Sequence, residues 1–317
     1  MRFLKRPMDA WPKAARFGDG VVLFSCKKFK GSQEIPAYLR IEPWTFTTNY
    51  RIEGAATQAI TDAWLYVDGN LLGCYEIQSH DDGKYVMIPV LEKDGHKLQI
   101  YPGVKLNGIA STRVQYPFYK PYIIDKVLKP GMIDTVNPAT KYYSIDSSSV
   151  RFKREAMEDF EDVNNIKLDS TSRSRTKIRQ VSHRTDPNAW MDPLDTLNRY
   201  RSGYIHLTDS IYMFDIASKE LRNLPAVGNY VLMEIDYKCD EEFLVGMYIH
   251  SSQYGLQDKE LYYVKATNEW KKIYINFSPT VTDSYYADYV KFYLRGTVGP
   301  SGSSNFYFDN IKLIYLE

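Results

Sequence analysis

The chain has 317 residues, of which 44% are hydrophobic and 25% charged, and 40 Lys+Arg balance 39 Asp+Glu. A formal charge of +1 argues against a generic nucleic-acid-binding or polybasic membrane protein, because either would carry an excess of positive charge. Aromatic residues make up 15% of the chain, including 27 Tyr, and Tyr favours half-buried strand surfaces and contact faces. The composition therefore favours a β-rich binding protein.

The N-terminal segment carries the first localisation signal. A basic start precedes a Leu-Phe-Ser-Cys tetrapeptide at 23–26, which resembles a bacterial lipobox whose Cys becomes acylated. Asp9, Pro12 and Lys13 interrupt the apolar stretch of about 7–15 residues that a secretory signal needs, so an ordinary thiol in a cytosolic protein is the alternative. We predict a signal over 1–26, lipid attachment at Cys26 and a tether over 27–35. This predicts a lipid anchor in the outer membrane, on either its periplasmic or its cell-surface face.

A first β domain is predicted over 36–128. Apolar runs flank Asp68-Gly69, and a second pair of runs, at 85–91 and 96–101, flanks Asp94-Gly95. A DG step between two such runs is a strong hairpin signal, because tight turns need residues that tolerate positive φ. We therefore expect two hairpins here.

The same runs carry a family resemblance. Residues 66–69, 72–73, 88–91 and 100–103 resemble a PEGA-type β-sandwich, a small immunoglobulin-like module of bacterial envelope proteins, and the following stretch 104–122 is similar to a segment in lipoproteins of Bacteroidota. The resemblance implies an immunoglobulin-like sandwich. Pro and Gly steps and a Ser triplet then predict a connector over 129–149.

A second β domain is predicted over 150–317. Its turn signals recur every 8–15 residues, which favours a two-sheet jelly roll and makes the whole chain all-β. The run at 306–313, with Asp309-Asn310 at its centre, resembles the last strand of carbohydrate-binding-module and galactose-binding-like jelly rolls. Apart from these, the predicted strands are 204–207, 210–216, 230–237, 243–250, 261–264, 270–277 and 289–295.

That resemblance also implies a structural calcium ion. Asp309 on the last strand would share the ion with Glu161 or Asp162 near the first strand, because carboxylates supply the hard oxygen ligands that Ca²⁺ needs. The alternative is that Asp309 and Asn310 cap a bulge through their own backbone bonds. No other cofactor is predicted.

Three further groups of side chains are candidates for binding. The segment 116–122 is aromatic and fixed by proline, suited either to docking a partner or to covering the end of a sandwich. A strand over 172–181 would line cations on one face, either to bind an anion or to protect a sheet edge. A tyrosine pair, together with Tyr289, could stack on sugar rings, and the predicted loop 255–260 is a further candidate for a binding edge. These residues are Tyr116, Phe118, Tyr119 and Tyr122; Arg173, Arg175, Lys177 and Arg179; and Tyr285 and Tyr286.

The function predicted from these patterns is binding without catalysis. The five His form no HExxH motif, and no GxSxG elbow or phosphate loop is present. The first interpretation is an accessory, protein-interaction subunit of an outer-membrane assembly. The alternative is a glycan-binding surface lipoprotein that uses the jelly roll, and a glycoside-active enzyme comes third. No nucleic-acid partner is expected.

Overall fold

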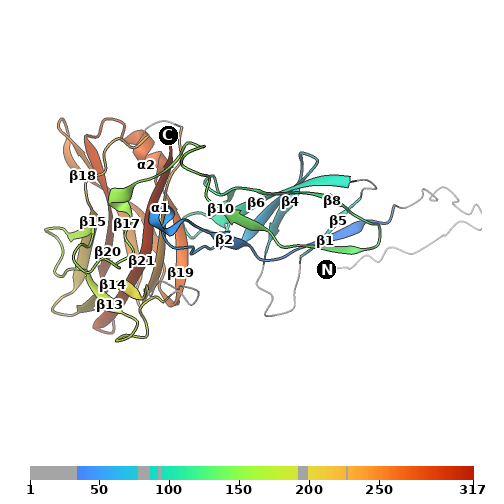
Figure 1. Ribbon diagram of the computed structural model, residues 1–317. Coiled ribbons are helices and arrows are strands. Elements are labelled where there is room, and N and C mark those ends of the chain that lie inside the picture. Colours follow the sequence, from blue (N-terminus) through green and yellow to red (C-terminus); the bar gives the residue numbers. More distant parts are fainter. Residues whose placement is uncertain (1–33, 78–85, 92–94, 192–198, 226–227) are drawn as a thin grey trace, which may run out of the picture. The chain divides into compact units, whose positions relative to one another are not determined.

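The computed structural model describes residues 34–77, 86–91, 95–191, 199–225 and 228–317 (Figure 1). Cys26, the predicted site of lipid attachment, lies outside these residues. Residues 36–317 form one compact unit. Within the described part of the chain, no helix has the length and apolar character needed to cross a membrane.

The first domain is built from short strands in three small sheets, ordered β5-β1-β9, β10-β2 and β4-β3-β6-β7, with β8 beside β6. Side chains alternate between core and solvent in β6, where Leu98 and Ile100 are fully buried. Its elements are β1 (Ala37–Ile41), β2 (Thr45–Thr47), α1 (Tyr50–Glu53), β3 (Asp62–Val67), β4 (Asn70–Glu76), β5 (Met87–Val90), β6 (Gly95–Lys105), β7 (Arg113–Gln115), β8 (Tyr122–Val127), β9 (Ile133–Val136) and β10 (Ala139–Lys141).

One of the two predicted hairpins is confirmed. Strands β3 and β4 pair through a turn in which Asp68 and Gly69 both have positive φ, at 49° and 82°. The second hairpin is wrong, because β5 pairs with β1 in one sheet while β6 pairs with β3 in another. The apolar alternation identified both strands, but it carried no information about which sheet each one joins.

The predicted connector over 129–149 is also wrong. It contains β9, which pairs in parallel with β1, and β10, which pairs in parallel with β2. These strands have four and three residues. Such short strands between Pro and Gly steps leave too little alternation to be recognised as strands.

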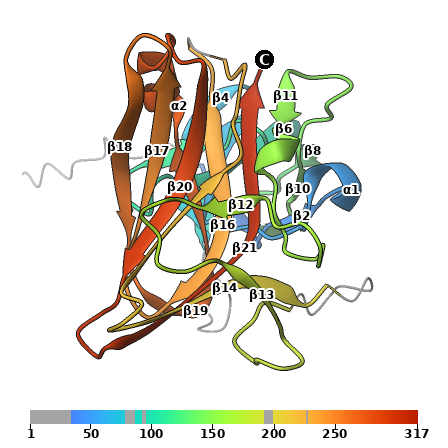
Figure 2. The ribbon, with the colours of Figure 1, turned by 90° about the vertical axis from the view of Figure 1, so that its left-hand side faces the viewer.

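The second domain confirms the predicted two-layer β-sandwich (Figure 2). One sheet has the order β13-β14-β21-β16-β19, with β11 on β21, and the other has the order β12-β15-β20-β17-β18. Its elements are β11 (Val150–Phe152), η2 (Arg154–Ala156), β12 (Leu168–Ser170), β13 (Arg179–Ser182), β14 (Arg201–Thr208), β15 (Met213–Ser218), β16 (Val231–Cys239), β17 (Phe243–Ser251), β18 (Gly255–Val264), β19 (Thr267–Asn276), α2 (Ser278–Asp283), β20 (Tyr289–Thr297) and β21 (Ser303–Leu316).

The core of the sandwich lies between these two sheets. It is filled by alternate residues of the facing strands, including Phe214, Phe292 and Phe308, each 1% exposed or less. The outer face of the sheet that contains β21 is covered in part by the first domain. Leu232, Ile314 and the ring of Tyr274 point outward from this sheet and belong to the apolar core of the first domain. The two domains therefore share a continuous buried surface.

Candidate functional site

The sheet β12-β15-β20-β17-β18 of the second domain, called the five-stranded sheet from here on, carries a dense polar network on its outer face. The network is centred on Arg295. Its guanidinium donates to Asp215 at 2.7 Å, to Asp258 at 2.8 Å and to the hydroxyl of Tyr248 at 2.9 Å. Burial raises the pKa of Tyr248 to about 12, helped by its hydrogen bond to Asp215, so the hydroxyl stays protonated and donates to that carboxylate. These bonds hold four strands in one rigid surface, because the residues come from β15, β17, β18 and β20.

Tyr293 lies at the centre of this surface. Its ring crosses β17 at Gly246, where a Cβ atom would stand only 2.1 Å from the ring, so no larger residue fits under it. The guanidinium carbon of Arg295 lies 4.4 Å from the centre of the Tyr293 ring. The Tyr293 hydroxyl donates to Asp258 at 2.6 Å. Burial acts to raise the pKa of Asp258, but the bonds from Tyr293 and Arg295 outweigh it and hold that pKa below its ordinary value.

A groove of about 300 Å³ runs beside this network. Its apolar surface comes from Leu256, which is 62% exposed, and from the half-buried ring of Tyr289. Its polar surface comes from Asp258, Lys291 and Arg173, and Arg173 pairs with Asp258 at 2.5 Å. The groove therefore offers an apolar contact and both hydrogen-bond donors and acceptors at one place on the sheet.

More aromatic side chains gather at the Gly255 end of β18. The imidazole of His250 stacks on Tyr289 with the ring centres 4.6 Å apart. Tyr286 contacts both Tyr254 and Tyr285, and its hydroxyl donates to Gln257, the neighbour of Leu256. Tyr285, predicted from the sequence as a binding residue, is 76% exposed. Its role in binding stays a prediction. The segment 255–260, predicted to be a loop, is instead part of β18 and carries Leu256 and Asp258 of the groove.

The predicted strip of cations is wrong. Residues 171–178 form turns and irregular backbone between β12 and β13, so the side chains do not share a strand face. Arg173 pairs with Asp258 on the five-stranded sheet, whereas Arg179 lies over the ring of Tyr204 on the other sheet. Arg175 lies over Tyr212. The period of two in the sequence arises in a loop, where it has no structural meaning.

The aromatic segment 116–122 docks, but it docks within its own chain. Tyr116, Phe118 and Tyr119 are at most 2% exposed, and the ring of Tyr116 lies 4.9 Å from that of Tyr274 on β19. The hydroxyl of Tyr116 donates to Glu234 on β16 at 2.7 Å. The prediction that these three side chains form a docking surface for another protein is therefore wrong, and Tyr122 is half-buried beside them.

The predicted calcium ligands do not converge in the structure. Glu161 accepts from the backbone N–H of Arg201 at 2.8 Å, and the side chain of Asp162 accepts from the backbone N–H of Asn164. Asp309 is buried and accepts from the backbone N–H of Asn310 at 2.7 Å, as in the alternative without a metal. In the part of the chain that the structure describes, no three His, Cys, Asp or Glu side chains are grouped to hold a metal ion.

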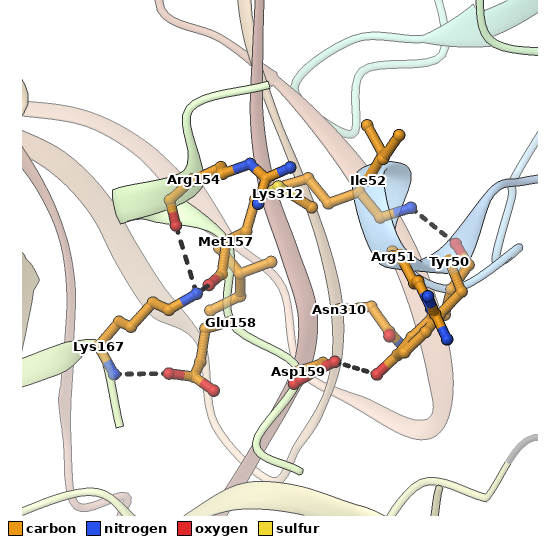
Figure 3. A pocket seen from close by; sticks show the side chains of 13 residues that line it. Tyr50, Arg51, Ile52, Arg154, Met157, Glu158, Asp159, Lys167, Asn310 and Lys312 are labelled. Atoms are coloured by element: carbon orange, nitrogen blue, oxygen red, sulfur yellow. Dashed lines mark hydrogen bonds between the residues drawn. The ribbon is translucent and has the colours of Figure 1, made fainter. Parts of the chain in front are cut away.

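A separate hollow of about 210 Å³ lies where the α1 segment meets the second domain (Figure 3). The hydroxyl of Tyr50 donates to Asp159 there, and the backbone N–H of Lys167 donates to Glu158 at 2.5 Å (Figure 3). The buried ammonium of Lys312 donates to the carbonyl of Ala55 at 2.6 Å. Two of these three bonds join the first domain to the second, so the hollow is a seam between the domains.

Comparisons with known proteins show no family for this chain. No protein-family profile and no curated protein matches the chain. Solved structures match at a TM-score of 0.34, and three of them are described as follows. One is a carbohydrate-binding module of the β-sandwich superfamily, with 8% identity over 80% of this chain and 84% of that one. The second is a family 22 xylan-binding domain from Paenibacillus barcinonensis, with 15% identity over 50% of this chain and 98% of that one. The third is a tandem of family 22 modules from the same organism, with 13% identity over 88% of this chain and 77% of that one. At these TM-scores and identities the similarity shows neither a family nor a function for this chain.

The first functional prediction, an accessory subunit of an outer-membrane assembly, is corrected here. It was motivated by the tyrosine-rich surfaces and by the aromatic segment 116–122, and Tyr116, Phe118 and Tyr119 of that segment are buried against the second domain.

Proposed function

We propose that the second domain binds a polysaccharide in the groove on the outer face of the five-stranded sheet, and that it binds without transforming its ligand. The observation that carries this proposal is the pairing of apolar surface from Tyr289 and Leu256 with the charged groups of Asp258, Arg173 and Lys291 in one groove. A pyranose ring has an apolar C–H face and a rim of hydroxyls that both donate and accept. It therefore needs an aromatic or aliphatic surface and hydrogen-bonding side chains side by side.

The rigidity of the groove supports the same proposal. Asp258 is held by Tyr293, Arg295 and Arg173, so its remaining acceptor capacity is fixed in direction. Lys291 is half-buried, and its ammonium lies 5.6 Å from the centre of the Tyr289 ring. A site whose side chains are already ordered loses little entropy when it binds a flexible chain such as a glycan.

A glycan array followed by calorimetric titration tests the proposal. Tyr289→Ala and Lys291→Ala are each expected to weaken binding about ten-fold or more, because each removes one of the two kinds of contact in the groove. Tyr230→Ala is the matched control, since Tyr230 is 46% exposed and does not line the groove. Folded protein that binds no glycan on the array would overturn the proposal, and so would equal losses in all three variants.

The predicted lipid anchor at Cys26 is a separate part of the proposal, which would place the glycan-binding domain at the outer membrane. Its support is the Leu-Phe-Ser-Cys tetrapeptide at 23–26. Mass spectrometry of the protein from native membranes is expected to find an N-terminal acylated Cys26. An unmodified Cys26 with the preceding residues intact would remove the anchor and leave the groove as proposed.

A further inference from the structure

Two tryptophans form a second aromatic platform, far in sequence from the groove residues of β17 and β20. Trp190 follows β13, and Trp270 lies on β19 of the six-stranded sheet. Both are half-buried, and their ring centres are 5.6 Å apart at an interplanar angle of 70°. A pair of large rings that is only half covered gives an extended apolar surface to a ligand.

Hydrogen bonds fix both tryptophans in place. The indole N–H of Trp270 donates to the carbonyl of Asn188 at 2.8 Å, and the backbone N–H of Trp190 donates to the hydroxyl of Ser202 at 2.7 Å. The Trp270 ring also contacts Tyr307 on β21. The platform is thus held by the loop before Trp190 and by the sheet beneath Trp270.

The two rings line a hollow of about 290 Å³. Beside them lie Asp236 and Lys272, both nearly inaccessible to solvent at 3–4% side-chain exposure, which form an ion pair at 3.4 Å. Gln58 of the first domain lines the hollow from the other side. Its side-chain oxygen accepts from the backbone N–H of Ile60, which leaves the amide NH₂ as a donor.

We infer that this hollow, defined here as the Trp190–Trp270 site, is a second carbohydrate-binding site that holds one or two pyranose rings between the first and second domains. The volume lies at the small end of ligand pockets, which suits a short sugar. The tryptophan rings contact the C–H face of the sugar, while Gln58 and the exposed Lys271, which also line the hollow, provide polar groups for its hydroxyls. The inference rests on the proposed function for the class of ligand, and it uses none of the groove residues.

Titration of the full chain with xylohexaose, cellohexaose and β-1,4-galactotriose, together with a glycan array, tests the inference. Trp270→Ala and Gln58→Ala are each expected to weaken binding of at least one glycan, about ten-fold for Trp270→Ala and several-fold for Gln58→Ala. Trp190→Ala is a second aromatic variant in case Trp270→Ala fails to fold, and thermal unfolding of each variant checks folding. Tryptophan emission is expected to shift on binding in the wild type. It should stay unchanged in the double variant that carries both Trp190→Phe and Trp270→Phe.

The outcomes separate the two sites. Losses in the Trp270 and Gln58 variants that Tyr289→Ala does not share support the Trp190–Trp270 site. Binding that is lost only in Tyr289→Ala overturns the second site and leaves the proposed function standing. A wild-type protein that binds no glycan in any of these assays overturns both.

Discussion

Tyr116 donates a hydrogen bond of 2.7 Å to the carboxylate of Glu234, and both side chains are buried although they belong to different domains. Tyr142 donates to the same oxygen at 2.8 Å, and Lys272 lies 3.1 Å from the other oxygen. Burial alone would raise the pKa of Glu234, but Lys272, Lys312 and the two hydroxyls outweigh it, so that pKa lies below its ordinary value. The carboxylate is therefore charged inside the junction, and the first domain supplies part of what stabilises it.

Replacing Tyr116 by Phe should destabilise the protein by about 2 kcal/mol, because a buried charged acceptor loses a donor. Tyr119→Phe is the matched control. Tyr119 is equally buried, but its hydroxyl lies 3.4 Å from that of Tyr274 and makes only a weak hydrogen bond. Urea unfolding monitored by fluorescence measures both. Equal losses of stability in the two variants would mean that the bond to Glu234 contributes nothing of its own.

Most strands of the second domain could be predicted from the sequence, but the covering of the sheet's outer face could not. Alternation in β19 correctly placed Ile273 and Ile275 toward the core. On β16 the same alternation indicates that Glu234 faces water, yet the first domain covers it. A charged residue in an alternating strand is typical of a solvent-facing position, and its partner on β19 lies 38 residues further along the chain, from 234 to 272. Nothing local in the sequence marks that pairing.

The candidate sites show the same limit. Tyr285 can be named as a candidate from the sequence because adjacent tyrosines in a loop are conspicuous, and its binding role stays a prediction. The groove cannot, since Asp258 and Lys291 lie on separate strands that meet through the pairing of β17 with β18 and β20, and Arg173 reaches them from the loop after β12. The Trp190–Trp270 site was missed for the same reason: its tryptophans are 80 residues apart, and Gln58 belongs to another domain.

Gly246→Ala should destabilise the protein by about 2 kcal/mol, because the added methyl group would overlap the ring of Tyr293. Gly95→Ala is the matched control in another strand, where the nearest side-chain atom would be an ordinary 3.6 Å from the new Cβ. Thermal and urea unfolding measure the effect. Tyr293→Leu in the Gly246→Ala background should recover part of the loss by removing the overlapping ring; failure to recover any of it would contradict this explanation.

Lys312→Met should change the pH dependence of stability. Burial lowers the pKa of Lys312 to about 8, against 10.5 for an unperturbed lysine. Between these values the unfolded chain binds more protons than the native one, so this residue makes stability rise with pH. The stability of the Met variant relative to the wild type should therefore fall by about 2–3 kcal/mol between pH 7 and pH 10. The lost bond to Ala55 adds a cost that does not depend on pH.

Urea unfolding at pH 7, 8, 9 and 10 measures this difference in stability between variant and wild type. Lys271→Met, which changes an exposed charge on β19, two strands away in the same sheet, should show no such trend. A difference that stays constant with pH for Lys312→Met would mean that the buried ammonium has an ordinary pKa.

Asp309 is the residue for which the sequence left two explanations open, and its substitution by Asn distinguishes them. Burial raises the pKa of Asp309 well above its ordinary value, and Asp236, Asp159 and Glu161 raise it further. Because the pKa of Asp309 is higher in the native state than the value of about 4 in the unfolded chain, the native state binds more protons than the unfolded chain at pH values between the two. Stability therefore falls as pH rises through this range. Asp309→Asn removes that penalty and should be more stable than the wild type at pH 7, with the difference shrinking toward pH 4. Asp209→Asn, at an exposed position, controls for the change in net charge.

Because the Asp309 oxygens already accept from Asn310 and Ser202, we expect unfolding midpoints to be the same in calcium chloride and in EDTA. A midpoint that calcium raises in the wild type but not in Asp309→Asn would instead establish the metal site implied by the resemblance of the last strand.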